Sequence, residues 1–417
     1  MFRSKICLCL TGSTIAENLQ YVNRYRNWID MVELRADHLT PDERLHIRKF
    51  PELAGIPAIL TIRRRIDGGK FIAGEGARTI LFARGLAFAD QDTRKNFAYI
   101  DLESDFYVPS IQDAARAFGT KVIRSIHNMQ GPVIDLPEQV KKLSATGADI
   151  VKIAFMPRSL SDVTKLFVQA RELEGKNMIL IAMGNTGLPS RILASKLHSF
   201  CTYTSPAEII ENPAAPGQLD PITLCTTYNF RSVDDDTTDL FGITGYPLLH
   251  TNSPAIHNQG YHEKRMNAAY VPFAAKHVEE SLEFANSLGL KGFSVTVPHK
   301  ETILSSLGQI SAETGDIGAC NTVVKRDGSW YGYNTDATGI SRALLEFLGV
   351  KNLKKIKVSI IGAGGAARAT AHAVKELHGK ACIFNRTVSR AKQIAELYNF
   401  KWTALDPSSE YLLEEYS

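Results

Sequence analysis

The sequence predicts an α/β protein with an N-terminal (β/α)8 TIM barrel, a second α/β domain and a truncated Rossmann domain. Eight short apolar stretches rich in β-formers alternate with helix-like segments over about 220 residues, a length that suits such a barrel. A segment rich in Pro, Thr and Asp then breaks the periodicity, and a glycine-rich turn follows a strand-like stretch near residue 362. We therefore expect a barrel over 1–222, a linker over 223–240, a substrate-binding domain over 241–340 and a partial Rossmann domain over 341–417.

The expected barrel strands are short runs of apolar and β-branched residues. Most runs are apolar on both faces, which is typical of parallel strands that are covered on both sides. Helix-like segments such as ARTILFARGLAFAD and LSDVTKLFVQARELEG separate them. The strands are expected at 5–10, 30–35, 57–63, 97–103, 121–127, 149–155, 178–184 and 200–205.

The second half begins a new α/β series at FGITGYP. Strand-like YVPFAA and GFSVTV are followed by NTVVKRDGSWYGYN, which predicts a hairpin with its turn at RDGS. After the glycine-rich turn and its helix, we expect one strand at ACIFNRT, one helix at SRAKQIAELYN and one strand at FKWTAL. A dinucleotide fold has two mononucleotide halves, so the Rossmann domain is expected to be truncated.

Composition narrows the class of protein. The formal net charge is +4 and the basic residues are scattered, which argues against a nucleic-acid partner and favours small anionic substrates. We expect no membrane partner, because no apolar run approaches the roughly 18 residues of a membrane span. The N-terminus lacks a signal-peptide pattern, so a cytoplasmic location is expected. The six cysteines form no CxxC pair, and no metal site is expected.

Lys152 lies in an apolar run, GADIVKIAFMP, where burying an ammonium is costly. It falls at the carboxyl end of its expected strand, where barrel active sites lie. A lysine that reaches solvent or pairs with a carboxylate is the alternative. Burial beside positive charge predicts a pKa lowered toward neutrality, and a neutral amine forms imines with carbonyl groups. Polar residues end other strands in the same way: Glu33, Arg35, Arg63 and His127.

His127 ends the strand that precedes the strand of Lys152. A protonated imine is an electron sink, so a base beside it can remove a proton α to the former carbonyl carbon. An imidazole suits this task near neutral pH. A purely structural histidine is the alternative, and the position opposite Lys152 in a barrel favours the base.

Six motifs in order resemble the type I 3-dehydroquinate dehydratase family over residues 1 to about 220. They are ELRAD (33–37), TIRRRIDGG (61–69), SIH (125–127), DIVKIAFMP (149–157), GNTGLPSR (184–191) and APGQ (215–218). The resemblance implies a Lys152 imine with the C3 carbonyl of 3-dehydroquinate. It implies that His127 moves the C2 proton and then protonates the departing hydroxyl, giving 3-dehydroshikimate. The implied substrate-binding residues are Glu33, Arg35, Arg63, Arg191 and Gln218.

Three positions depart from this family. Asp67 stands where the family usually has a glutamate that is thought to orient the histidine, and a shorter carboxylate is expected to slacken that pairing. Cys9 and Ala214 stand where the family often has serine contacts. We expect these changes to affect substrate affinity more than the chemistry.

IIGAGGAA fits the GxGxxA pattern of a dinucleotide-binding turn between a strand and a helix. The next strand ends without the acidic residue that binds a ribose hydroxyl, and Arg386 stands in its place, which favours NADP over NAD. A solvated surface arginine is the alternative. The expected cofactor-binding residues are Gly362, Ala363, Gly364, Gly365, Ala366, Asn385, Arg386, Thr387 and Arg390.

Four polar clusters, HTNSP (250–254), SVTVPHK (294–300), ACNTV (319–323) and YNTDATG (333–339), resemble shikimate dehydrogenase. The resemblance implies that Lys300 and Asp336 form the catalytic pair. Taken singly, a surface lysine and a helix N-cap are the alternatives. Thr251 replaces the usual serine, and Ser294 stands where asparagine is common. The implied shikimate-binding residues are Thr251, Ser253, Thr296, Asn321 and Asp336.

The two resemblances together imply a bifunctional shikimate-pathway enzyme. The barrel is expected to dehydrate 3-dehydroquinate, and the second module to reduce 3-dehydroshikimate to shikimate with NADPH. One alternative is an active dehydratase that carries a truncated, inactive dehydrogenase remnant. A second is a non-enzymatic sensor, similar to fungal repressors built from the same two modules.

Overall fold

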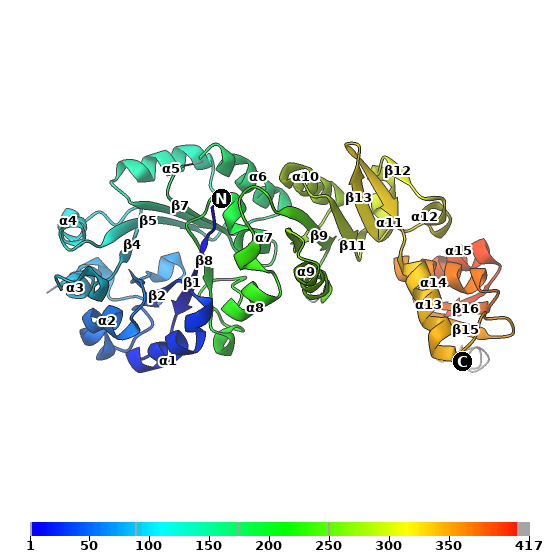
Figure 1. The fold of residues 1–417 in the computed structure, drawn as a ribbon, viewed down its shortest axis with the longest axis horizontal. Helices are drawn as coiled ribbons and strands as arrows, with labels where there is room; N and C mark the ends of the chain where they lie inside the picture. The colour runs from blue at the N-terminus through cyan, green and yellow to red at the C-terminus, as the bar shows by residue number, and fades with distance from the viewer. Residues whose placement is uncertain (1, 88–89, 174, 249–250, 407–417) are drawn as a thin grey trace. The chain divides into compact units, whose positions relative to one another are not determined.

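The computed structural model describes residues 2–87, 90–173, 175–248 and 251–406 (Figure 1). The chain divides into two compact units. The first contains Met1–Phe241, Leu248–Ala275 and Glu280–Gly289, and the second contains Gly242–Pro247, Lys276–Glu279 and Leu290–Ser417.

The first unit contains the predicted barrel. Its strands are hydrogen-bonded in the order β7-β6-β5-β4-β3-β2-β1-β8, and a parallel bridge between Met178 and Ser199 joins the two ends of this sheet. All the neighbouring pairs are parallel, so the expected fold class is confirmed. The strands are β1 (Lys5–Leu10), β2 (Met31–Arg35), β3 (Ala58–Thr61), β4 (Tyr99–Glu103), β5 (Lys121–Asn128), β6 (Ile150–Phe155), β7 (Met178–Ala182) and β8 (Cys201–Thr204).

Helices cover the outside of these strands (Figure 1). Local signals set several of their ends. The Thr14 side chain caps the first helix by accepting a hydrogen bond from the Glu17 amide, and Gly55, at φ 58°, ends the second in the left-handed region. The helices are α1 (Ile15–Tyr25), α2 (Phe50–Ala54), α3 (Gly74–Leu86), α4 (Pro109–Ala117), α5 (Leu136–Ala145), α6 (Leu160–Arg171), α7 (Leu188–Ile192) and α8 (Pro221–Thr226).

The barrel interior changes from apolar to charged along the strands. Near the amino ends the inward side chains form an apolar floor that includes Met31, Ile59, Ile123, Ile150 and Ile179. Successive inward positions are two residues apart. The next ones toward the carboxyl ends carry buried polar and charged groups, among them Glu33, Thr61, Asp101, Ser125 and Lys152.

The segment that the sequence assigns to a linker, 223–240, is folded onto the first unit. It contains the end of α8, a short 3-10 helix (Phe230–Ser232) and the start of β9 (Asp239–Gly245). Leu224, Phe230 and Val233 are buried, and the Arg231 side chain forms an ion pair with Asp30 at 2.6 Å.

Three more elements lie wholly or mostly in the first unit: α9 (Ser253–Glu263), β10 (Ala268–Ala274) and α10 (Val278–Leu288). Phe284 of α10 is fully buried. Its ring stacks on Phe273 with centroids 5.1 Å apart and meets Phe167 of α6 edge-on at 6.2 Å. These aromatic contacts attach α10 to the outside of the barrel.

The second unit contains the end of β9 and a mixed sheet that continues β9-β11-β13-β14-β12. The predicted hairpin is present: β13 and β14 pair antiparallel, and the turn residues Asp327 and Gly328 have φ of 47° and 80°. The elements are β11 (Gly292–Val295), α11 (His299–Thr302), β12 (Gln309–Ile310), α12 (Ala312–Ile317), β13 (Thr322–Arg326), β14 (Ser329–Tyr333) and α13 (Asp336–Leu348).

A three-stranded parallel sheet, β15-β16-β17, completes the described part of the second unit. Its helices bury small apolar residues against it, such as Ala371 and Ala391, together with Ile383 of the middle strand. The sheet is the strand-turn-helix series expected of a Rossmann half. The elements are β15 (Lys357–Ile361), α14 (Gly365–Glu376), β16 (Lys380–Asn385), α15 (Val388–Tyr398) and β17 (Lys401–Ala404).

Replacing Phe284 with alanine should lower the free energy of unfolding of the first unit by about 3–5 kcal/mol, because it leaves a cavity between two other rings. Urea unfolding of the full chain, followed by circular dichroism, measures the change. Ile134→Ala is the matched control, since that side chain is 86% exposed and its loss should cost less than about 0.5 kcal/mol. Equal effects of the two substitutions would contradict the packing described here.

Candidate active site

Lys152 projects from β6 into the barrel, where only 5% of the residue is exposed. Its Nζ lies 2.9 Å from Asp101 Oδ2 and 3.4 Å from Glu33 Oε1. It also lies 4.2 Å from the centroid of the Tyr203 ring. These four residues come from the even-numbered strands β2, β4, β6 and β8, the arrangement of one side-chain layer in such a barrel. We call them the lysine layer.

The pKa of Lys152 is raised, and the expectation that it is lowered was wrong. Burial does lower this pKa, but the nearby carboxylates of Asp101 and Glu33 more than offset burial and the repulsion from Arg63. At rest the amine is therefore an ammonium that is shielded from water and paired. Of the two interpretations of the sequence, the carboxylate-paired lysine describes this resting state.

The two carboxylates of the lysine layer are held by their own partners. Glu33 accepts hydrogen bonds from the Thr61 hydroxyl at 2.8 Å and the Cys9 thiol at 2.9 Å. Asp101 accepts one from the Ser125 hydroxyl at 2.6 Å. The pKa of Glu33 is lowered: burial raises it, but the positive charges of Lys152 and Arg35 outweigh burial.

Sequence reasoning missed Asp101, Ser125 and Tyr203. A signal for the first was present, because Asp101 and Glu103 alternate at the carboxyl end of FAYIDLE. The rule that selected Glu33 and Arg35 at the end of β2 selects these two carboxylates as well.

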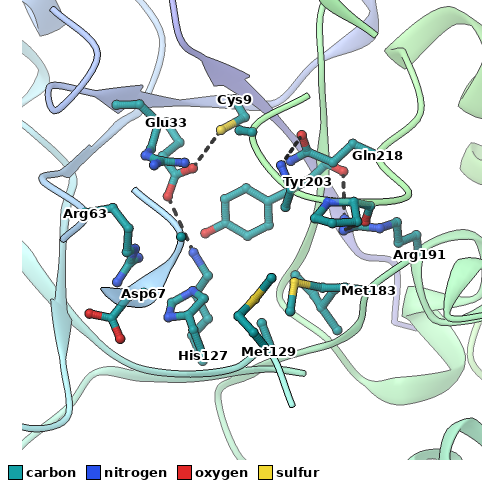
Figure 2. Close-up of a pocket in the computed structure, with 18 residues that line it drawn as sticks. Cys9, Glu33, Arg63, Asp67, His127, Met129, Met183, Arg191, Tyr203 and Gln218 are labelled. Atoms are coloured by element: carbon teal, nitrogen blue, oxygen red, sulfur yellow. Dashed lines mark hydrogen bonds and ion pairs between the residues drawn. The ribbon is translucent and has the colours of Figure 1, made fainter. Parts of the chain in front are cut away.

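His127 lies on the same face of β5 as Ser125, the residue in register with Lys152 on β6. Its Nδ1 is buried and has no hydrogen-bond partner among the described residues. Burial, followed by the charges of Arg63 and Lys152, holds the pKa of His127 well below its usual range. The imidazole is therefore neutral at physiological pH, with an unused nitrogen at the pocket (Figure 2).

Asp67 lines the same pocket but is engaged elsewhere. Its carboxylate accepts a hydrogen bond from Arg64 Nε at 2.7 Å, and Arg64 also bonds Asp105. Within the described part of the chain, no hydrogen bond joins Asp67 to His127. An aspartate at this position thus leaves the histidine without the orienting contact that the family resemblance implies.

The pocket guanidinium groups differ in their partners. Arg35 donates two hydrogen bonds to Asp37 at 2.9 and 2.8 Å, and Arg63 pairs with Asp101 and Glu103. Arg191 instead donates only to the carbonyl oxygens of Tyr203 and Pro216, at 3.3 and 3.0 Å, and its Nε has no partner among the described residues.

Arg191 is therefore the pocket arginine that is ready to bind an anionic group. Burial lowers its pKa to about 10, which still leaves it charged at neutral pH. Gln218 lies in the same lining and accepts a hydrogen bond from the Ala215 amide. All the barrel residues that the sequence nominates line this one pocket, together with the three departures: Glu33, Arg35, Arg63, His127, Lys152, Arg191, Gln218, Cys9, Asp67 and Ala214.

In the second unit, Lys300 and Asp336 form an ion pair with Nζ and Oδ2 2.5 Å apart. The Asn321 amide donates to the other carboxylate oxygen of Asp336 at 2.7 Å. The structure thus brings these three nominated residues into one polar cluster. Thr296 follows β11, and its amide donates to the Thr244 carbonyl at 2.9 Å.

Thr251 and Ser253 belong to the first unit, at the start of α9. The Thr251 hydroxyl accepts a hydrogen bond from the Ser253 amide at 3.2 Å, and both residues are partly exposed. Ser294 lies on β11 and is also partly exposed. A role for these hydroxyls in substrate binding stays a prediction.

The glycine-rich turn between β15 and α14 is open. Gly362 has φ of 110°, and its amide donates to the Phe384 carbonyl at 2.8 Å. A Cβ added at Gly362 or Gly364 would meet no atom within 4 Å. Gly364 is the N-cap of α14, and because it has no side chain it leaves the first amides of the helix uncapped. The free amides of this helix end, beside an open backbone, suit a phosphate group.

The end of β16 lies next to this turn, because Ile361 pairs with Phe384 in the sheet. Asn385 follows, and its side chain donates to the Thr387 carbonyl at 2.9 Å. The remaining nominated residues here, Arg386, Thr387 and Arg390, are exposed. These residues fit a dinucleotide whose ribose carries an additional phosphate.

Gly365 connects this turn to Lys300. A Cβ at Gly365 would lie 2.8 Å from the Cβ and 2.9 Å from the Cδ of Lys300. The stem of Lys300 therefore crosses the first residue of α14 at a distance that only glycine permits.

Over the described ranges, no three His, Cys, Asp or Glu side chains are grouped to hold a metal ion. None of the helices there is long and apolar enough to cross a membrane.

Family models match three stretches of the chain. The type I 3-dehydroquinase model matches residues 6–235, the shikimate dehydrogenase substrate binding domain matches 243–323, and shikimate/quinate 5-dehydrogenase matches 346–415. All the residues that line the barrel pocket lie within the first of these matches, whereas β14 and Asp336 lie between the second and the third.

Curated proteins of the same families are similar in sequence to this chain. The chain is 33% identical over 93% of its length to the bifunctional 3-dehydroquinate dehydratase/shikimate dehydrogenase of Arabidopsis thaliana, covering 65% of that protein. It is 31% identical over 72% of its length to the shikimate biosynthesis protein AroDE of Chlamydia muridarum, covering 61%. A shikimate dehydrogenase (NADP(+)) of Caldanaerobacter subterraneus is 40% identical over 39% of the chain, which covers 58% of it. The chain thus spans about three-fifths of these relatives.

Gly365→Ala should lower the free energy of unfolding of the second unit by about 1–3 kcal/mol, because the new methyl group displaces the Lys300 stem. Chemical denaturation followed by tryptophan fluorescence measures this. Gly339→Ala is the control: this glycine is also helical, and its Cβ would meet nothing within 4 Å. Alanine there should be neutral or stabilising. A Gly365→Ala protein as stable as the control would refute the close contact.

Proposed function

This chain belongs to the type I 3-dehydroquinase family, and we propose that its barrel dehydrates 3-dehydroquinate to 3-dehydroshikimate. One observation carries the proposal. The Lys152 amine is buried in the same pocket as a neutral His127 whose Nδ1 is unused. An amine shielded from water and a free base are the two groups that imine-based elimination needs.

The reaction begins with capture of the substrate carboxylate by Arg191, since the other pocket arginines are already paired. Lys152 then gives up a proton to solvent water, and Nζ attacks the C3 carbonyl to form a carbinolamine. The carbinolamine hydroxyl takes up a proton and leaves as water, which gives the protonated imine. The protonated imine withdraws electrons, and His127 removes the C2 proton. His127 returns that proton to the departing hydroxyl, and hydrolysis of the imine restores Lys152. The net products are 3-dehydroshikimate and water.

Reduction with borohydride in the presence of 3-dehydroquinate should leave a covalent adduct on Lys152, identified by peptide mass spectrometry. His127→Ala should still form the imine but lower kcat by about 10²- to 10⁴-fold, as loss of a general base does. Lys152→Ala is the control and should give no adduct. Absence of an adduct on the folded, unsubstituted protein would exclude the imine mechanism.

For the second module, we propose NADPH-dependent reduction of 3-dehydroshikimate to shikimate. NADPH, when bound, supplies the electron pair and hydrogen that reduce the ketone. Gly362, Gly364 and the amides that begin α14 would hold its phosphates, and Arg386 with Arg390 would hold the 2′-phosphate. The shikimate dehydrogenase relatives named for NADP(+) support this assignment.

The chain's own contribution to the reduction is a proton held between Lys300 and Asp336. The ion pair, with Asn321 on the second carboxylate oxygen, places an acidic group at the polar cluster. Donation of that proton to the new alkoxide completes the reduction. Thr251, Ser253 and Thr296 are proposed to bind the substrate hydroxyl and carboxylate groups.

NADPH absorbance at 340 nm should fall when 3-dehydroshikimate is added to the protein, and Lys300→Ala should slow this by about 10²- to 10⁴-fold. Arg386→Ala should raise the KM for NADPH with less effect on kcat. No loss of absorbance, with dehydration intact, would support an inactive dehydrogenase remnant. Ligand binding with neither reaction would support a sensor.

The partners of the enzyme are proposed to be these small molecules rather than nucleic acid. A cytoplasmic location is proposed, and the six free cysteines support a reducing compartment.

A further inference from the structure

We propose that Asp101 is the positioning residue of Lys152: it fixes the amine in the lysine layer and sets the pH range over which that amine condenses with a ketone. This inference rests on the proposed dehydratase function. It concerns a residue that the sequence argument did not nominate.

Asp101 is the nearest charged partner of Lys152. The Nζ to Oδ2 distance is 2.9 Å, against 3.4 Å to Glu33. The other oxygen of Asp101, Oδ1, accepts from the Ser125 hydroxyl at 2.6 Å and pairs with Arg63 at 2.9 Å. Because both oxygens are engaged and the side chain is fully buried, the carboxylate has no freedom to turn away from the amine.

Charges from several strands act on the Lys152 amine, and Asp101 is the charge that raises its pKa most. Glu33 and Asp101 favour the ammonium, while burial and Arg63 disfavour it. Asp101 also pairs with Arg63, so its removal withdraws the main attraction and leaves Arg63 less compensated. Both changes favour the neutral amine. The titratable and charged groups that face Lys152 are Cys9 of β1, Glu33 and Arg35 of β2, Arg63 following β3, Asp101 of β4, His127 of β5 and Tyr203 of β8.

Asp101 is unsuited to be the base that takes the proton from Lys152. Its pKa is strongly lowered, because the positive charges of Arg63 and Lys152 outweigh the effect of burial. Asp101 thus remains a carboxylate throughout. When the imine forms and is protonated, the positive charge stays on the same nitrogen, and Asp101 still faces it. The residue therefore stabilises the electron-withdrawing form of the imine.

Glu103 offers a matched control. It is on the same strand, two residues further along, and is equally buried. It pairs with Arg63 at 2.7 Å and Arg78 at 2.6 Å, and its carboxylate is not among the main charges that act on Lys152. Glu103→Gln therefore removes a buried charge from the same network without removing the direct partner of the amine.

The test measures the initial rate of reductive trapping of 3-dehydroquinate on Lys152 by cyanoborohydride, from pH 6 to pH 12, because the pKa of Lys152 in the unsubstituted protein is raised above its ordinary value. In Asp101→Asn the midpoint of the rise in trapping should lie about 1–3 pH units below that of the unsubstituted protein, as expected for loss of a close opposite charge. Glu103→Gln should shift it by less than half as much. Dehydration kcat should fall in Asp101→Asn even where trapping is fast, because the protonated imine has lost its counter-charge.

Asp101→Glu provides a second variant. It keeps the charge, so its midpoint should match the unsubstituted protein, but the longer side chain displaces the amine and should slow trapping at least tenfold at every pH. Trapping at the unsubstituted rate in Asp101→Glu, or an unshifted midpoint in Asp101→Asn, would overturn the inference while leaving the dehydratase intact. Absence of any adduct on the unsubstituted protein would instead overturn the proposed function.

Discussion

The arrangement of charges in the barrel depends on one buried ion pair, Lys152 with Asp101. An isolated ammonium at this depth would cost several kcal/mol and would lose its proton. The pair is part of a chain of alternating charges that runs from Lys152 through Asp101, Arg63, Glu103 and Arg78. Removing one of these charges leaves its neighbours unpaired in a medium of low dielectric constant. The network therefore stabilises the fold only while all of its members are present.

This ion chain also explains why Arg191 is distinctive. The carboxylates of the pocket are paired with lysine or with other arginines, whereas among the described residues Arg191 bonds only the carbonyl oxygens of Tyr203 and Pro216. A ligand carboxylate therefore meets one uncommitted guanidinium. The floor below the lysine layer is apolar, so the polar groups that a ligand can reach lie in that layer and above it.

Much of the fold was predictable because its signals are local. Strand periodicity, the RDGS turn and the glycine-rich turn each lie within a few consecutive residues, and the structure has an element at each. The expectation that active-site residues lie at the carboxyl ends of barrel strands likewise selected Glu33, Arg63, His127 and Lys152, which line one pocket. The pKa of Lys152 was not predictable in this way. Its direction is set by carboxylates 51 and 119 residues away along the chain, and the sequence does not give the layer in which they meet.

Asp67 and His127 illustrate a different limit. A carboxylate one methylene shorter is a small change in sequence, but the structure shows it bonded to Arg64, with the imidazole nitrogen left unpartnered among the described residues. Which of two nearby cations or rings a short side chain reaches depends on distances of about an ångström. Sequence pattern and spacing do not predict which of these partners the carboxylate bonds.

Gly365 has a consequence for redesign of the nucleotide module. The strand end at Asn385–Arg386 and the turn at Gly362–Gly365 both face the expected dinucleotide, but only the turn also supports Lys300. Substitutions at the strand end can therefore change nucleotide binding without displacing the Lys300 side chain. A larger side chain at residue 365 would instead change both the nucleotide-binding turn and the position of Lys300. Residue 365 is therefore restricted to glycine for two separate reasons.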